Sequence, residues 1–191
     1  MARAFRTTRR GITGDFESGE LKLLRRLFAD VVQLLEPEKR KDEDPLAAMV
    51  GIDPEAERPA DSAVARLLPD AVRNDDDGAL EFRRLTERSL REEKVGALRA
   101  AALLMEKPQV VLTPEQAQLL AKALTDVRLV LADRLDIQTD EDAARLHDIA
   151  DLEDAEDLES YLALVYNFVT WVQEGLVQAL LSSAGHPSGE R

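Results

Sequence analysis

Apolar residues recur at intervals of three and four positions along most of this chain, which is the spacing of one face of an α-helix. The longest run extends from Leu158 to Leu181. Its opposite strip is polar but nearly uncharged and consists of Ala163, Asn167, Thr170, Glu174 and Gln178. A helix that is apolar over most of its circumference is usually buried among other helices. This stretch therefore predicts a long central helix with an apolar face of Leu158, Tyr161, Leu162, Val165, Phe168, Val169, Val172, Leu176 and Leu180.

Other stretches show the same apolar period, and several of them are preceded by residues that typically cap the first turn of a helix. Ser18 is the expected N-cap of the first helix, and Ser89 with Glu92 predicts a capping box at the start of another. Thr113-Pro114-Glu115-Gln116 combines an N-cap, a proline at the first helical position and a capping box. The expected helices are Ser18–Leu35, Leu46–Val50, Ala63–Leu68, Ala79–Leu85, Leu90–Met105, Thr113–Leu135 and Thr139–Leu146.

Two short segments at the N-terminus, Phe5–Thr8 and Ile12–Phe16, flank the turn residues Arg9-Arg10-Gly11. Glycine supplies the positive φ that such a hairpin turn requires. Val110–Leu112 is too short for a sheet of its own, but it could join the hairpin as a further strand. The sequence therefore predicts a mainly α fold, a bundle of about six to eight helices with a small N-terminal β-hairpin.

The length of 191 residues favours one helical domain over residues 1–191. Residues 1–17 form its β-hairpin arm, and residues 183–191 are expected to be a frayed tail because they are small and polar. Residues 37–62 contain prolines and clustered charges, which is typical of a linker region.

Charge restricts the class of partner. The chain has 25 Lys and Arg against 38 Asp and Glu, a net charge of −13. Such a field repels phosphate backbones over most of the surface, so nucleic acid is not the expected partner. The basic residues cluster early, and Arg3, Arg6, Arg9 and Arg10 are a candidate partner-binding group. That group could bind an acidic protein or nucleic acid, or it could meet the acidic stretch Asp148–Glu159 of a second copy.

Cysteine is absent, which excludes disulfides, thiol catalysis and cysteine-ligated metals from this chain. The N-terminus lacks the apolar segment of a secretory signal. Four polar residues would each be costly in lipid if Leu158–Leu181 crossed a membrane, namely Asn167, Gln173, Glu174 and Gln178. We therefore expect a cytoplasmic protein without a membrane span.

The sequence contains no glycine-rich phosphate loop, no HExxH and no GxSxG pattern. Asp75-Asp76-Asp77 is acidic, but consecutive acids without an EF-hand glutamate predict a helix start rather than a calcium site. His147 lies near Asp142, Asp148 and Asp151, where a surface histidine is favoured over a metal ligand. We therefore expect no catalytic residues, no metal and no cofactor, and a protein that is not an enzyme.

Arg128 interrupts an apolar helix, and Glu174 is the only Asp, Glu, Lys or Arg between Ser160 and Gly189. A partly buried arginine requires a carboxylate or other acceptors. We therefore predict an ion pair between Arg128 and Glu174 that fixes the register of the two longest apolar helices and has a structural role.

Residues 124–135, LTDVRLVLADRL, resemble the pattern L-N-D-x-R-L-x-L-G-x-R-L of an actinobacterial family of unknown function that includes the oxidative-stress regulator AosR. Thr125 and Ala132 stand where the family usually has Asn and Gly. Supporting segments follow the family order along the chain, namely Leu67–Asp70, Glu81–Glu87, Lys94, and Tyr166 through Trp171–Glu174 to Leu176-Val177.

The resemblance implies a regulatory protein that acts through protein–protein contacts and binds a sigma factor in a stress response. The family's regulator is described as sensing oxidation through a cysteine pair near its N-terminus. This chain has Phe5-Arg6-Thr7-Thr8-Arg9 in that region and no cysteine, so any such binding here would lack a thiol switch. The alternatives are a DNA- or RNA-polymerase-associated protein that uses the N-terminal arginines, and a metal-assisted enzyme. A homodimer formed through an exposed apolar helix face is compatible with each of these functions.

Overall fold

The computed structural model describes residues 4–36, 52–53, 55–146 and 157–184. Within these ranges the chain is mainly helical and carries a small antiparallel sheet, so the predicted fold class is confirmed. The described elements are β1 (Phe5–Thr8), β2 (Gly11–Asp15), α1 (Ser18–Leu35), α3 (Ser62–Leu67), α4 (Asp76–Leu104), β3 (Gln109–Leu112), α5 (Pro114–Arg134), α6 (Asp140–Leu146) and α7 (Leu158–Ala184).

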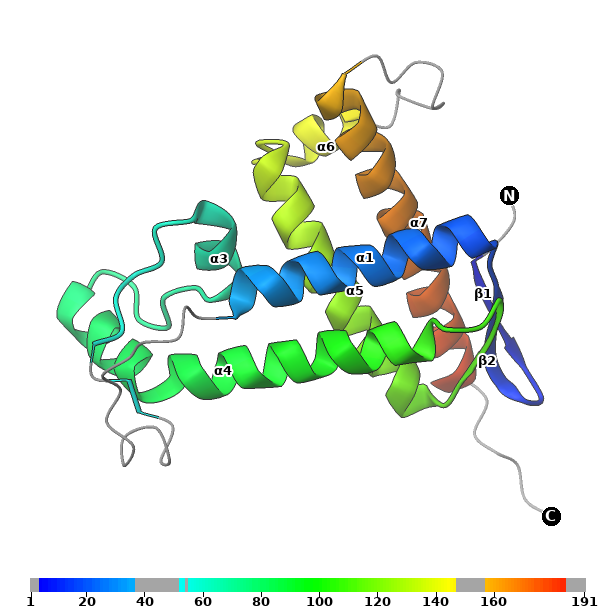
Figure 1. Ribbon diagram of the computed structural model, residues 1–191, viewed down its shortest axis with the longest axis horizontal. Coiled ribbons are helices and arrows are strands. Elements are labelled where there is room, and N and C mark those ends of the chain that lie inside the picture. Colours follow the sequence, from blue (N-terminus) through cyan, green and yellow to red (C-terminus); the bar gives the residue numbers. More distant parts are fainter. Residues whose placement is uncertain (1–3, 37–51, 54, 147–156, 185–191) are drawn as a thin grey trace.

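The long helices form two pairs. α1 and α4 lie side by side and run in opposite directions, while α5 and α7 pack together and cross that first pair steeply (Figure 1). The sheet packs against the C-terminal half of α7, and α6 lies at the opposite end of the second pair (Figure 1). The N-terminal half of α7 consequently extends beyond α1, on the side away from α4 (Figure 1).

The sheet has the order β1-β2-β3 with antiparallel neighbours, which confirms both the hairpin and the third strand. Phe5 pairs with Gly14, and Ile12 pairs with Leu112. Gly11 has a φ of 118°, and a Cβ there would lie 2.6 Å from the carbonyl oxygen of Leu112. Both the turn and the close approach of β3 therefore require glycine at this position.

The hydrophobic core lies where the two helix pairs cross. Of the predicted apolar face of α7, Val165, Val169, Val172 and Leu176 are buried in it, and Leu162, Phe168 and Leu180 are half-buried. Leu158 and Tyr161 differ, because they are 73% and 43% exposed. They lie in the first turn of α7, and the N-terminal half of this helix extends beyond α1 (Figure 1). The largest fully buried side chains are Phe5, Phe28, Ile12, Leu24, Leu35, Leu67, Leu68, Leu98, Met105, Leu112, Leu120 and Leu124.

The prediction of two separate helices over Ala79–Leu85 and Leu90–Met105 is wrong, because α4 is continuous from Asp76 to Leu104. The Ser89 hydroxyl donates to the carbonyl oxygen of Thr86 within the helix and caps no new one. A capping sequence inside a helix is overridden when neighbouring turns are held by other contacts.

The first helix also begins differently from its prediction. Glu17, not Ser18, is the N-cap of α1, and its backbone N–H donates to the Glu20 carboxylate at 2.7 Å. The carboxylate of Glu20 therefore satisfies a backbone donor at this helix start, as in a capping box.

Several expectations fall on residues outside the described ranges. These include the helix Leu46–Val50, most of the linker, and residues 185–191 of the expected tail, whereas α7 itself continues to Ala184. Ala56, in the described part of the linker region, is only 3% exposed. None of the described helices combines the length and apolar character needed to cross a membrane.

Candidate functional site

Arg83 joins the start of α4 to the segment that follows α3. Its side chain is 6% exposed, and its Nη2 donates to the carbonyl oxygen of Leu68 and to the Asp70 carboxylate, both at 2.9 Å. Its Nη1 forms an ion pair with Glu87 one turn along the helix. Hydrogen bonding to the Arg83 guanidinium is the main reason that the pKa of Asp70 lies below its ordinary value.

Glu87 extends this link to α1. Its second carboxylate oxygen accepts from Arg91 Nε at 2.8 Å, and Arg91 Nη1 donates to the carbonyl oxygen of Leu35 at 2.9 Å. Leu35 is the last residue of α1, so one carboxylate holds two arginines that contact different segments. The ion pairs of Glu87 also span the position where the sequence predicted a break in α4.

Lys94 and Asp126 form a second link, between α4 and α5. Lys94 Nζ lies 2.7 Å from Asp126 Oδ1, and Asp126 is 6% exposed. Burial raises the pKa of the Asp126 carboxyl although Lys94 acts in the opposite direction. This pair was not predicted from the sequence, although a charged side chain at a core-facing position of each apolar helix was an available signal.

Arg128 forms the third link, between α5 and α7, and here the prediction of an Arg128–Glu174 ion pair is wrong. Arg128 Nη1 donates to Gln173 Oε1 at 2.7 Å, and Nη2 donates to the Tyr166 hydroxyl at 3.3 Å. The guanidinium carbon lies 5.4 Å from the centre of the Tyr166 ring, a cation–π contact.

Glu174 is exposed. One residue turns a helix by about 100°, so Gln173 faces α5 and Glu174 does not. Gln173 completes the contact by donating from Nε2 to Thr125 Oγ1 at 2.6 Å and to the carbonyl oxygen of Ala121 at 3.2 Å. An amide therefore takes the place of the expected carboxylate.

Two shallow hollows lie along α4 and share Leu90 in their lining. One has a volume of about 250 Å³ and contains the Lys94–Asp126 pair, with Lys122 and Thr125 from α5. The other has a volume of about 200 Å³ and includes Arg83 beside Phe82, which is 47% exposed. Lys94 and Asp126 already contact each other in the first hollow, and Arg83 contacts Asp70 and Glu87, which also line the second.

The candidate group of N-terminal arginines is not assembled into one site. Arg6 pairs with Asp15 at 3.1 Å across the hairpin, and both side chains are largely exposed. Arg9 and Arg10 are exposed at the hairpin turn, which projects from the molecule (Figure 1). Arg3 lies outside the described residues.

The metal alternative concerned His147 with Asp148 and Asp151, all three of which lie outside the described residues. Asp142 is described, and its carboxylate accepts from the backbone N–H groups of Gln138 and Thr139 at 3.1 Å and 2.9 Å. These contacts at the start of α6 lower the pKa of Asp142 to about 2. Among the residues that the structure describes, no group of three or more acidic or histidine side chains is arranged to hold a metal.

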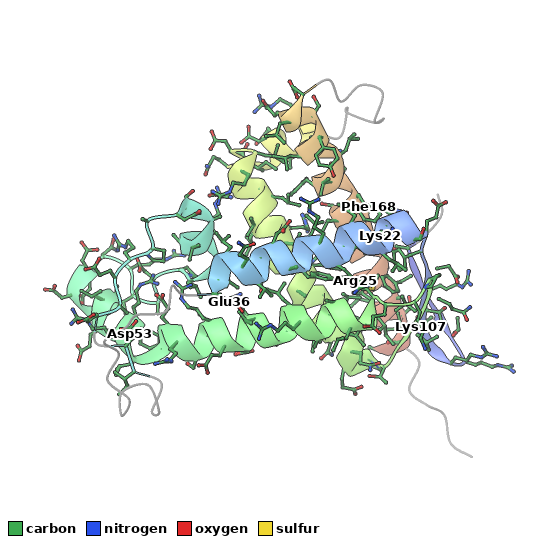
Figure 2. The ribbon with its side chains drawn as sticks, viewed as in Figure 1. Lys22, Arg25, Glu36, Asp53, Lys107 and Phe168 are labelled. Atoms are coloured by element: carbon green, nitrogen blue, oxygen red, sulfur yellow. The ribbon has the colours of Figure 1, made fainter. Side chains whose placement is uncertain are left out.

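A row of large apolar residues lies on the outer side of α7. Tyr161 and Trp171 are 43% and 37% exposed, and Leu164 and Phe168 between them are half-buried. The Phe168 and Trp171 rings pack together with their centres 6.1 Å apart. Figure 2 shows Phe168 on α7, near the place where α1 crosses that helix in this view. We call Tyr161, Leu164, Phe168 and Trp171 the aromatic row.

A family model described as "Domain of unknown function (DUF2017)" matches residues 2–180, which is most of the 191-residue chain. The chain belongs to this family. No curated protein and no solved structure matches it. Membership in the DUF2017 family therefore confirms a family of unknown function and gives no activity by itself.

Each of the three polar links in this DUF2017 protein joins two segments that carry the resemblance described above. Arg83 joins Glu81–Glu87 to Leu67–Asp70, Lys94 meets residues 124–135 through Asp126, and Arg128 meets the segment that begins at Tyr166. These segments are far apart in sequence, and the structure places their polar side chains in contact.

Proposed function

We propose that this protein is a non-enzymatic, cytoplasmic regulatory protein that acts by binding another protein. The observation that carries the proposal is the aromatic row on α7, where two large aromatic side chains are more than one third exposed. A contiguous exposed apolar surface of this kind is typical of protein-binding sites. Tyrosine and tryptophan are also the residues that most often supply binding energy at such interfaces.

The polar links support a structural role for the charged residues in the resembling segments. Arg83, Lys94 and Asp126 each contact an oppositely charged group inside the molecule, and Arg128 contacts an amide and a phenol. A side chain engaged in this way is held in place and couples one helix to another. The links would therefore present the aromatic row on a stable scaffold.

A sigma factor is the partner implied by the resemblance to the family of AosR. The direct test is to mix the purified chain with purified extracytoplasmic-function sigma factors from its own organism and to measure complexes by size-exclusion chromatography and calorimetry. We expect a complex with one of them. The chain has no cysteine that dithiothreitol could reduce or peroxide could oxidise. The affinity of its own binding surface for the sigma factor should therefore be the same in both conditions.

The proposal is wrong if no complex forms with any of these sigma factors or with RNA polymerase under either condition. The second candidate, association with DNA, is supported by the exposure of Arg9 and Arg10 at the projecting turn. Duplex binding that weakens steeply with salt and disappears in Arg9→Ala/Arg10→Ala would favour it.

A further inference from the structure

The aromatic row has the geometry of a helix-binding surface. Its members follow one another in steps of three, four and three residues, so they lie on one face of α7. At 1.5 Å per residue the row extends over roughly 15 Å. This is the length of about three helical turns, and it matches a partner helix that presents apolar residues at the same spacing.

The same face of α7 is covered further along by strand β1. Gly175 lies one turn beyond Trp171, and a Cβ there would be 3.2 Å from the backbone nitrogens of Ala4 and Phe5. In the next turn, the Thr7 hydroxyl donates to the carbonyl oxygen of Ala179 at 2.8 Å. The face thus has small residues where β1 covers it and large apolar residues where β1 ends. It is one continuous packing surface, of which the chain's own strand covers only the C-terminal half.

Charge indicates which occupant fits the other half. α7 contains no Lys, Arg or His, and the exposed acid next to the aromatic row is Glu174, one turn beyond Trp171. Glu159 is also exposed, but it points to the same side of the helix as Val177, away from the row. The chain as a whole has a net charge of −13. This field attracts cationic partners and repels a second copy of the same chain.

We propose that the aromatic row binds an amphipathic helix whose apolar face packs on Tyr161, Phe168 and Trp171 and whose flanks carry Lys or Arg. This inference deepens the proposed function and rests on it, since it specifies the surface and the chemistry of the protein partner.

The test uses Trp171, which is the sole tryptophan of the chain and a member of the row. The probe is a synthetic Leu/Lys peptide of about 18 residues, long enough to hold a helix, with leucines on one face. Two comparison peptides have the same length, one with Glu in place of Lys and one with the Leu/Lys order scrambled. We expect the Leu/Lys peptide to shift the emission of Trp171 to shorter wavelength with saturable binding, and the other two to bind at least about tenfold more weakly.

The peptide with Glu in place of Lys is included because α1 carries two cations, Lys22 and Arg25. In the view of Figure 2 this helix crosses α7. Equal or tighter binding of the Leu/Glu peptide would overturn the assignment of a cationic partner. Equal binding of the scrambled peptide would show that charge alone is responsible and would overturn the helix-binding row.

Matched variants locate the surface. Phe168→Asp should weaken binding of the Leu/Lys peptide at least about tenfold, whereas Val177→Asp should not. Val177 is a fair control because it is 40% exposed on the same helix but points to a different side. Circular dichroism checks that both variants fold, and Tyr161→Asp replaces Phe168→Asp if the latter does not. Unchanged binding in the folded row variant overturns the proposed surface.

Failure of this inference differs from failure of the proposed function. If a sigma factor binds the wild-type chain and the Phe168→Asp variant equally well, the function stands and the surface is wrong. A concentration-dependent dimer that Phe168→Asp abolishes would mean that a second copy occupies the row, and it would overturn the heterologous partner.

Discussion

At the scale of single residues, the Lys94–Asp126 pair is the most informative interaction to remove, because Asp126 is 6% exposed and forms an ion pair with Lys94 at 2.7 Å. Truncating one partner leaves a buried charge without its counterion. We expect Lys94→Met to lower the free energy of unfolding by about 3 kcal/mol. Urea denaturation monitored by circular dichroism measures this change.

The double variant Lys94→Met/Asp126→Leu is the matched control. It removes both charges, so it should recover most of the loss seen in Lys94→Met, since an apolar pair of similar volume is often as stable as a buried ion pair. A double variant that is less stable than the single variant would contradict this account of the link.

The α5–α7 contact gives a second comparison, between neighbouring residues of one helix. We expect Gln173→Ala to cost about 1–2 kcal/mol, because Arg128 Nη1 loses an acceptor and Thr125 and Ala121 lose a donor. Glu174→Ala should change stability by less than about 0.5 kcal/mol, because Glu174 is exposed. Equal losses in the two variants, measured by urea unfolding, would restore the rejected Arg128–Glu174 pair.

These residues also show what the sequence could and could not give. The isolation of Arg128 in an apolar helix indicated correctly that it needs a partner on the other long helix. Periodicity alone could not choose between Gln173 and Glu174, because a rotation of about 100° decides it and the phase of a helix depends on its packing. The prediction chose Glu174 because a carboxylate would neutralise the charge of Arg128. In the structure Arg128 instead donates to the amide of Gln173 and the phenol of Tyr166.

At the scale of elements, the contact between β1 and α7 depends on a missing side chain. A Cβ at Gly175 would lie 3.2 Å from three atoms of Ala4 and Phe5, while a Cβ at Gly96 in α4 would meet nothing within 4 Å. Gly96→Ala should therefore stabilise the protein by about 0.5–1 kcal/mol through helix propensity. Gly175→Ala adds the same propensity but displaces β1, so its stability should fall at least about 1 kcal/mol below that of Gly96→Ala.

Thermal and urea unfolding of the two glycine variants give the comparison, and amide exchange of the hairpin shows whether β1 is released. Equal stabilisation by both substitutions would mean that β1 accommodates the methyl group at no cost. The close packing of β1 on α7 would then be less strict than the structure indicates.

The elements were predictable where a local signal was strong. Thr113 and Pro114 start α5 as expected, and the hairpin follows from its glycine turn. The break expected at Ser89 was wrong because a capping sequence is local, whereas the continuity of α4 depends on Glu87 and on packing against α1 and α5. The strand β3 could be placed only because the hairpin offered it an edge.

At the scale of the whole molecule, each of the three polar links joins a different pair or set of segments. Arg83 and Arg91 tie α4 to α1 and to the segment after α3, Lys94 ties α4 to α5, and Arg128 ties α5 to α7. Composition predicted a helical bundle but not these contacts, since pairs of opposite charge are abundant in a chain with 38 acids. The exposed aromatic row was also hidden from periodicity, because its members share the apolar period with core residues of α7.

The pH dependence of stability follows from carboxyl groups whose pKa values are lowered by folding and from one, Asp126, whose pKa is raised by folding. Contacts with Arg83, Arg134 and the Gln138 backbone, respectively, lower the pKa of Asp70, Asp61 and Asp142, the last to about 2, from an ordinary value of 3.8. Their stabilisation is present above that ordinary value and is lost as the pH falls through the folded-state pKa. Burial raises the pKa of Asp126, so protonation of Asp126 favours the folded state and opposes this loss.

We expect the free energy of unfolding to decline from about pH 5 to about pH 2. The decline should be steeper in Lys94→Met/Asp126→Leu, which lacks the opposing group. Urea titrations at each pH measure both slopes, and a shallower decline in the double variant would show that the pKa of Asp126 is lowered by Lys94 rather than raised by burial.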